Sequence, residues 1–194
     1  PVDIRASLRK IDEMTANFQR RLSGNESPEE LVEKLNKLFF TDWGFTTDQA
    51  DTTGDDPNNL FLNTVLNRRK GYCLSLSIPY LCITQRAGLP FEGVPAPGHF
   101  FVRYERGKKR INVEATSDGA QIPDDFYIEK YKLDLPHPFY FHGIQQKRVV
   151  GIFLNNLGNI YSHHERYDKA RRIFEAAIFL NPNYPEAHTN LGSM

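Results

Sequence analysis

The amino-acid sequence predicts an α+β fold, and three observations lead to that prediction. The N-terminal part has apolar residues at helical spacing, the stretch from Phe100 to Ala115 changes to a period of two, and the last part follows a helix-pair repeat. Together they predict N-terminal helices, a core with a small antiparallel sheet, and a C-terminal helix pair. We expect a helical lobe over residues 1–45, a core over 46–147 and a repeat over 148–194.

Two helices are predicted in the N-terminal lobe. Apolar residues recur every three or four positions through residues 3–22, and Ser23-Gly24-Asn25 ends that pattern. Ser27 is a good N-cap, Pro28 suits the first helical position, and Glu30 completes a capping box. These residues therefore mark the end of one helix and the start of the next.

The chain then leads into a buried central helix. Residues 41–59 are polar and predict a long loop, with Trp43 and Phe45 as anchors, and a short helix over 60–69 follows. Beyond Gly71, residues 74–86 are apolar on all sides, as is typical of a helix at the centre of a protein.

The sheet is predicted from a change in periodicity. Residues 100–104 and 110–115 alternate between apolar and polar, and the loop between them contains Gly107, which indicates a hairpin. Residues 117–147 are rich in Pro and aromatic residues and show little periodicity. We expect that passage to wrap around the core or to link it to the repeat.

The C-terminal part matches the tetratricopeptide pattern of small and large packing positions, with Leu154 at the usual Trp position. The same phase restarts thirty-four residues later, at His188, Leu191 and Gly192. This predicts one full repeat and the start of a second. The matching positions are Leu154, Leu157, Gly158, Tyr161, Ala170, Phe174, Ala177 and Pro182.

Composition disfavours several classes of function. The chain has 24 basic and 24 acidic residues and no basic stripe, so we expect no nucleic-acid partner. No stretch reaches the roughly eighteen apolar residues of a membrane span, so we expect no membrane insertion. No secretory signal is visible, which favours the cytoplasm, although the chain opens on Pro1 rather than Met and export stays open.

Three residues have the types and order of a cysteine-dependent catalytic triad. Cys73 follows Gly71-Tyr72 at the expected start of the central helix, His99 opens a strand, and Glu114 ends the next one. A thiol, an imidazole and a carboxylate can serve as nucleophile, base and orienter. Asn112, two residues before Glu114 on the same face, is the alternative orienter, because an amide can also hold an imidazole.

The start of the central helix also offers an oxyanion site. The first backbone N–H groups of a helix have no intrahelical partner, and those at Cys73 could bind a developing negative charge. Asn67 is a further candidate, although an exposed helix amide is the commoner role for such a residue. No cluster has zinc-ligand spacing, and we expect neither metal nor cofactor. Cys82 lies nine residues after Cys73, too far along one helix for a disulfide.

The segments GYC, GHFFVRY and NVEAT resemble the transglutaminase-like superfamily, which has the papain-like cysteine-protease fold. The helical N-terminus, NTVLNRRKG and the trailing repeat are similar to a bacterial subfamily of these proteins. The resemblance implies that Cys73 is the nucleophile and His99 the base. The sequence differs from the usual family pattern at the third residue of the triad, because Glu114 and Ala115 stand where the family usually has Asp and Pro.

Two functions follow from these patterns as hypotheses. The first is acyl transfer through the triad, with hydrolysis of an amide or peptide favoured over cross-linking, and with a protein or peptide as substrate. The alternative is a catalytically silent module that recruits a protein partner through its repeat, because family members without the cysteine exist. The reactivity of Cys73 distinguishes the two.

Overall fold

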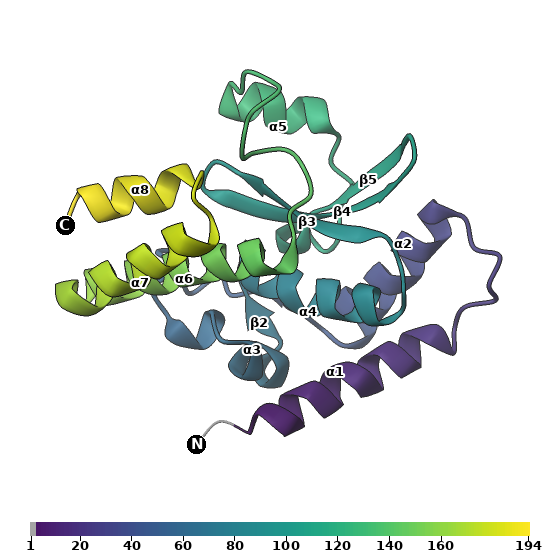
Figure 1. The fold of residues 1–194 in the computed structure, drawn as a ribbon. Coiled ribbons are helices and arrows are strands. Elements are labelled where there is room, and N and C mark those ends of the chain that lie inside the picture. The colour runs from purple at the N-terminus through teal and green to yellow at the C-terminus, as the bar shows by residue number, and fades with distance from the viewer. Residues whose placement is uncertain (1–2) are drawn as a thin grey trace.

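A single helix, α4 (Cys73–Arg86), runs through the centre of the molecule, and the other elements are arranged around it (Figure 1). The computed structural model describes residues 3–194; residues 1–2, the first two of the predicted helical lobe, lie outside the described part. Buried side chains occur on every side of α4, among them Leu76, Tyr80 and Ile83. The prediction of a buried central helix is therefore confirmed.

The N-terminal lobe consists of α1 (Ile4–Gln19) and α2 (Pro28–Asn36). Both halves of the predicted capping box are present, since Ser27 Oγ accepts from the Glu30 N–H and the Glu30 carboxylate accepts from the Ser27 N–H. The chain does not enter a loop at once but continues as one π-helical turn, Lys37–Asp42. That turn directs aromatic side chains into the core.

The polar segment that follows is held against the core by a two-stranded parallel pair. Strand β1 (Thr46–Thr47) pairs with β2 (Lys70–Gly71), and between them lie a 3₁₀ turn, Pro57–Asn59, and helix α3 (Leu62–Arg68). Asp48 fixes this segment, because its carboxylate accepts from Arg68 at 3.0 Å and from Asn59 at 3.1 Å. The predicted long loop is thus an ordered connection.

The main sheet has three antiparallel strands in the order β3-β4-β5, namely β3 (Phe91–Ala96), β4 (His99–Arg106) and β5 (Lys109–Val113). The β4–β5 hairpin was expected, whereas β3 was missed. Gly93 and Pro95 weaken the strand pattern there. The glycine is required by packing, since a Cβ on Gly93 would lie 2.3 Å from the Phe100 ring.

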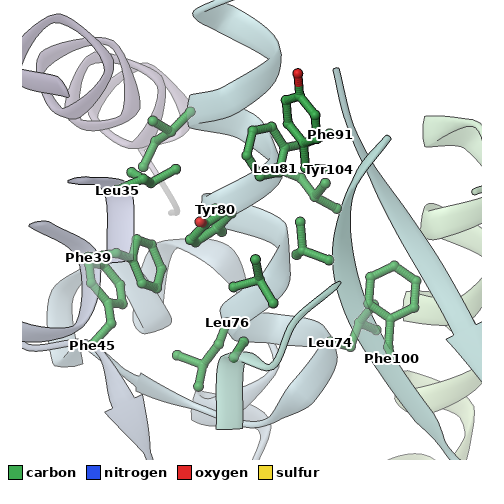
Figure 2. Close-up of a cluster of buried hydrophobic side chains, with 14 of the residues drawn as sticks. Leu35, Phe39, Phe45, Leu74, Leu76, Tyr80, Leu81, Phe91, Phe100 and Tyr104 are labelled. Carbon is green, nitrogen blue, oxygen red and sulfur yellow. The ribbon is translucent and has the colours of Figure 1, made fainter. Parts of the chain in front are cut away.

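The hydrophobic core fills the space between α4, the N-terminal helices and the sheet. Figure 2 shows Leu35, Phe39 and Phe45 on one side of α4 and Phe91, Tyr104 and Phe100 on the sheet side. The Phe39 and Phe45 rings stack with their centroids 4.2 Å apart. Phe45 is therefore an anchor of the core, as predicted.

Residues 117–147 contain an element that the sequence did not predict, helix α5 (Asp124–Tyr131). The helix is short, and only one of its residues, Tyr127, is buried, so no helical stripe is visible in the sequence. Its first turn is tied to the sheet because Arg103, which is fully buried, donates to Asp124 at 2.6 Å. A long-range ion pair, not local periodicity, locates this helix.

The C-terminal part consists of α6 (Gln146–His163), α7 (Tyr167–Leu180) and α8 (Pro185–Gly192). Figure 1 shows these helices together on one side of the molecule, with α8 near the β3–β4 end of the sheet. Ile152, Ala177, Tyr184 and Ala187 belong to the same buried cluster as the core residues. Within residues 3–194, no helix combines the length and the apolarity needed to cross a bilayer.

Candidate active site

Cys73 is the first residue of α4, and a tight turn before it sets its position. The Tyr72 N–H donates to Ser75 Oγ at 3.0 Å, and the Tyr72 carbonyl accepts from the Leu76 N–H at 2.9 Å. This turn passes so close to Gly71 that a Cβ there would lie 2.5 Å from Ser75 Oγ. Glycine is therefore needed at this position for close approach, and Cys73 stands at the helix end where backbone N–H groups lack intrahelical partners.

The structure brings His99 to both Glu114 and Cys73. His99 Nε2 lies 2.6 Å from Glu114 Oε2, and the side chains of the pair are 16% and 5% exposed. The Cys73 side chain lies close enough to the His99 ring to raise the pKa of the imidazole, and both residues line one cleft. Because Nε2 is engaged by Glu114, Nδ1 is the ring nitrogen left for the thiol. The three side chains that the sequence analysis singled out are thus brought together at one place in the fold.

His99 and Glu114 each stabilise the charged form of the other. Burial alone would lower the pKa of His99, but its interactions with the neighbouring Cys73 and Glu114 side chains outweigh burial and raise that pKa to about 9. Burial opposes the charge of Glu114 in the same way, and the bond to His99 nevertheless holds the pKa of the carboxyl below its usual value. The imidazole is therefore cationic at neutral pH.

Glu114 has further partners that fix its orientation. Its Oε1 accepts from Thr116 Oγ1 at 2.7 Å and from the Thr116 N–H at 3.2 Å. Its Oε2 also accepts from the buried hydroxyl of Tyr127 at 2.8 Å. Thr116 lies in the NVEAT segment already singled out, whereas Tyr127 was missed because α5 itself was missed.

Asn112 and Asn67, the further candidate site residues from the sequence analysis, lie outside this group. Asn112 accepts from Arg103 Nε at 2.7 Å and donates to Asp124 and to the Ile122 carbonyl, so it joins the network that holds α5 and not His99. Asn67 is exposed on α3, where its amide oxygen accepts from Lys10 at 3.3 Å. Neither residue is brought to the Cys73 thiol.

Cys73 and His99 line a cleft of about 510 Å³ between the core and the C-terminal helices. The repeat side of this cleft is formed by α6 and α8, which contribute Asn155, Asn159 and Asn190. Sequence reasoning did not assign any residue of the C-terminal helices to the site.

A second hollow, of about 560 Å³, lies between α1, α3, α4 and α6. It is lined mainly by apolar side chains and contains Cys82, but none of Cys73, His99 and Glu114. Burial raises the pKa of the Cys82 thiol, which disfavours its reactive form. The smaller cleft at Cys73 is therefore the candidate active site.

Comparison with known proteins agrees with this architecture. The sequence profile of the transglutaminase-like superfamily matches residues 5–155, and that of the tetratricopeptide repeat matches residues 152–184. Protein SirB1 of Salmonella typhimurium is 32% identical over 182 residues, covering 91% of this chain and 66% of SirB1.

Other relatives are more distant or match a shorter segment. A UPF0162 protein of Xylella fastidiosa is 27% identical over 175 residues, covering 81% of this chain and 58% of that protein. F-box only protein 21 of Mus musculus is 29% identical over 106 residues, covering 55% of this chain and 16% of its own length. No solved structure matches the chain significantly.

The chain thus spans less than two thirds of the bacterial UPF0162 relative, while its family match covers most of its own residues. The fold also has the parts that the sequence predicted, namely N-terminal helices, a small antiparallel sheet and a C-terminal repeat. The chain belongs to the transglutaminase-like superfamily and carries a tetratricopeptide repeat at its C-terminal end.

Proposed function

We propose that this protein is a cysteine-dependent acyl-transfer enzyme that hydrolyses an amide or peptide bond. The observation that carries the proposal is the position of His99, which lines the same cleft as Cys73 and whose Nε2 lies 2.6 Å from Glu114 Oε2. A cationic imidazole next to a thiol favours the thiolate, the form of cysteine that attacks carbonyl carbon. The helix start at Cys73 favours the same negative charge.

The first half of the reaction transfers the acyl group to the enzyme. The Cys73 thiolate forms a bond to the carbonyl carbon, and the π electrons of the carbonyl move to its oxygen, near the N–H groups at the start of α4. The carbonyl then re-forms, the carbon–nitrogen bond breaks, and the His99 imidazolium gives its proton to the leaving amine.

The second half returns the enzyme to its resting state. Neutral His99 takes a proton from water as the water oxygen attacks the thioester carbon. The carbon–sulfur bond breaks, a carboxylic acid leaves, and the thiolate–imidazolium pair is restored. An amine could replace water at this step, but water is far more abundant, so hydrolysis is the expected outcome. Residues Cys73, His99 and Glu114 suffice for this sequence.

The reactivity of Cys73 toward iodoacetamide tests the proposal. The rate of alkylation is followed by mass spectrometry across pH, and Cys82 of the same chain serves as an internal control. We expect Cys73 to react much faster than Cys82 near pH 6, and His99→Ala to remove that advantage, because the imidazolium that favours the thiolate is lost.

Slow alkylation of Cys73, similar to that of Cys82 and unchanged by His99→Ala, would contradict the proposal. The second candidate function would then be favoured, in which the chain is a silent module that recruits a protein partner. Its support is the tetratricopeptide repeat, a type of unit that presents helical surfaces to other proteins.

A further inference from the structure

The C-terminal helices contribute several side-chain amides to the cleft at Cys73. Asn155 and Asn159 come from α6, Asn190 comes from α8, and all three line the same cleft as Cys73 and His99. The match to the tetratricopeptide repeat includes Asn155 and Asn159, and Asn190 lies in the helix that directly follows it. The proposed reaction uses none of these amides.

The three amides form one hydrogen-bonded cluster. The Asn190 amide nitrogen donates to Asn155 Oδ1 at 2.9 Å and to Asn159 Oδ1 at 3.0 Å. Asn155 is buried, and its own amide nitrogen lies 3.5 Å from the Tyr184 hydroxyl. These bonds join α6 to α8 and hold the side chains in fixed orientations, so that a ligand would meet a preorganised surface.

The cluster keeps one donor and one acceptor available to a ligand. Within residues 3–194, neither the Asn159 amide nitrogen nor Asn190 Oδ1 has a protein partner, and both side chains are only partly buried. A peptide group offers one C=O and one N–H, which are the complement of these two free groups. The cluster can therefore bind main-chain amides without regard to side-chain identity.

The charge of the cleft favours a neutral ligand. Apart from Cys73 and His99, the charged side chain that lines it in the described part of the chain is Glu186. Both oxygens of Glu186 are occupied, one by the Gly98 N–H at 3.1 Å and the other by the Tyr140 hydroxyl at 2.6 Å. Among residues 3–194, the cation that lines the cleft is the His99 imidazolium, and it is already paired with Glu114, so it is not free to bind a phosphate or a carboxylate.

We propose that the amide cluster of Asn155, Asn159 and Asn190 binds the main chain of an extended polypeptide while Cys73 attacks one of its carbonyl groups. This inference rests on the proposed function and specifies its substrate class. A cleft of about 510 Å³ has the size of sites that hold drug-sized ligands, and a short peptide segment would fill it better than a single amide group. The repeat and the helix that follows it then supply the part of the substrate site that binds the main chain.

Two inhibitors with the same electrophile test this inference. One is an acetylated alanine chloromethyl ketone and the other an acetylated tetra-alanine chloromethyl ketone, and the second-order rate of Cys73 alkylation is measured for each. We expect the longer inhibitor to react about tenfold faster, because one or two additional hydrogen bonds between its main chain and the amide cluster are worth about that factor. Asn159→Ala should bring the ratio of the two ketone rates down to about one, whereas His188→Ala, on the exposed side of α8, should leave both this ratio and the iodoacetamide rate unchanged.

The outcomes separate this inference from the proposed function. If iodoacetamide reacts rapidly and in a His99-dependent way but both ketones react equally, or if the advantage persists in both Asn159→Ala and Asn190→Ala, the inference is wrong and the proposed function stands. If Cys73 is unreactive, acetylated tetra-alanine amide is titrated into the Cys73→Ala variant. A shift of the Asn159 side-chain NH₂ resonances in the NMR spectrum would then support the peptide site without catalysis, and no shift would overturn it.

Discussion

At the scale of single residues, Glu114 is the most heavily bonded group of the site. Its two oxygens accept from His99, Thr116 and Tyr127, and its side chain is only 5% exposed. A buried carboxylate is stable only when such partners compensate its lost hydration. The additional methylene of Glu, compared with the Asp usual in this family, is accommodated without loss of the contact to His99.

The charge of His99 can be followed by NMR titration of its ring. We expect the imidazolium to persist through neutral pH and to lose its proton near pH 9, because Cys73 and Glu114 outweigh the effect of burial. Glu114→Gln should bring the midpoint down toward that of an ordinary histidine, since the carboxylate that pairs with the imidazolium is removed. A midpoint near 6.5 in the unmodified protein would show that the predicted charge pair is absent.

Tyr127→Phe is expected to lower the free energy of unfolding by about 1–3 kcal/mol, because a buried carboxylate loses one donor. The pKa of Glu114 is held low in the folded state, so its contribution is present above the ordinary carboxyl pKa and is lost as pH falls. The stability difference between the two proteins, measured by urea unfolding, should therefore shrink in acid.

Tyr131→Phe, on the same helix, is the matched control for Tyr127→Phe. Among the described residues, the Tyr131 hydroxyl has no hydrogen-bond partner, so its removal should change stability little at any pH. An equal effect of the two substitutions would indicate a general loss of packing in α5 and not the loss of a bond to Glu114.

The residues of the proposed triad could be predicted from the sequence because each one follows a local signal. Cys73 stands after Gly71 at a helix start, and His99 opens an alternating strand. The residues that were missed, Tyr127 and the amides of α6 and α8, have no such local signal. Their role depends on contacts between distant segments, and these become visible only in the folded chain.

At the scale of elements, the packing of α6 against α7 depends on one glycine. A Cβ on Gly158 would lie 2.4 Å from the Phe174 ring, which is fully buried. This contact is the small-and-large pairing that the repeat pattern predicted, and it explains why glycine is accepted in the middle of a helix despite its low helix propensity.

Gly158→Ala should lower the free energy of unfolding by about 1–3 kcal/mol, because the added methyl group forces the two helices apart. Gly192→Ala is the matched control, since it is also a helical glycine and its Cβ would have no atom within 4 Å. That variant should be neutral or slightly more stable, as expected from helix propensity alone. Thermal or urea unfolding compares the two, and equal destabilisation would contradict the packing argument.

Helices and strands could be predicted where the signal for them lies within a short stretch of the sequence. The capping box of α2, the all-round burial of α4 and the β4–β5 hairpin could be deduced from spacing alone. Strand β3 was missed because Gly93 and Pro95 obscure its pattern, and α5 because its stability comes from the Arg103–Asp124 pair. Tertiary contacts override weak local preference at both places.

At the scale of the whole molecule, the repeat helps to shape the candidate site. Glu186 of α8 accepts from the Gly98 N–H, in the turn directly before His99, and from the Tyr140 hydroxyl. The last helix thereby holds the turn that presents the imidazole. Binding at the repeat and reactivity at Cys73 are therefore expected to depend on each other.

Glu186→Ala should slow the alkylation of Cys73 near pH 6 several-fold and leave Cys82 unaffected, because the turn before His99 loses its acceptor. Glu175→Ala is the control, since Glu175 is an exposed residue of α7 whose partner is Arg171. Mass spectrometry after iodoacetamide treatment measures both cysteines in one experiment. An unchanged Cys73 rate in Glu186→Ala would show that α8 does not position His99.

The boundary placed between residues 147 and 148 stays a prediction, and it falls near the start of α6. Composition and periodicity suggested separate units on either side, whereas the buried cluster runs from Ile11 to Ala187 without division. The spacing of apolar residues shows that a helix has a buried face, but it does not show which neighbouring element covers that face. The sequence therefore did not reveal that the C-terminal helices share one hydrophobic core with the rest of the chain.

Helix α6 also imposes a constraint on how the chain can change in length. The superfamily match ends at residue 155 and the repeat match begins at residue 152, so one continuous helix serves both. Each residue inserted into a helix rotates everything after it by about 100° around the axis. A single insertion or deletion just before residue 152 would therefore swing the later helices out of register with the core, and natural length variation should be confined to the connections outside α6.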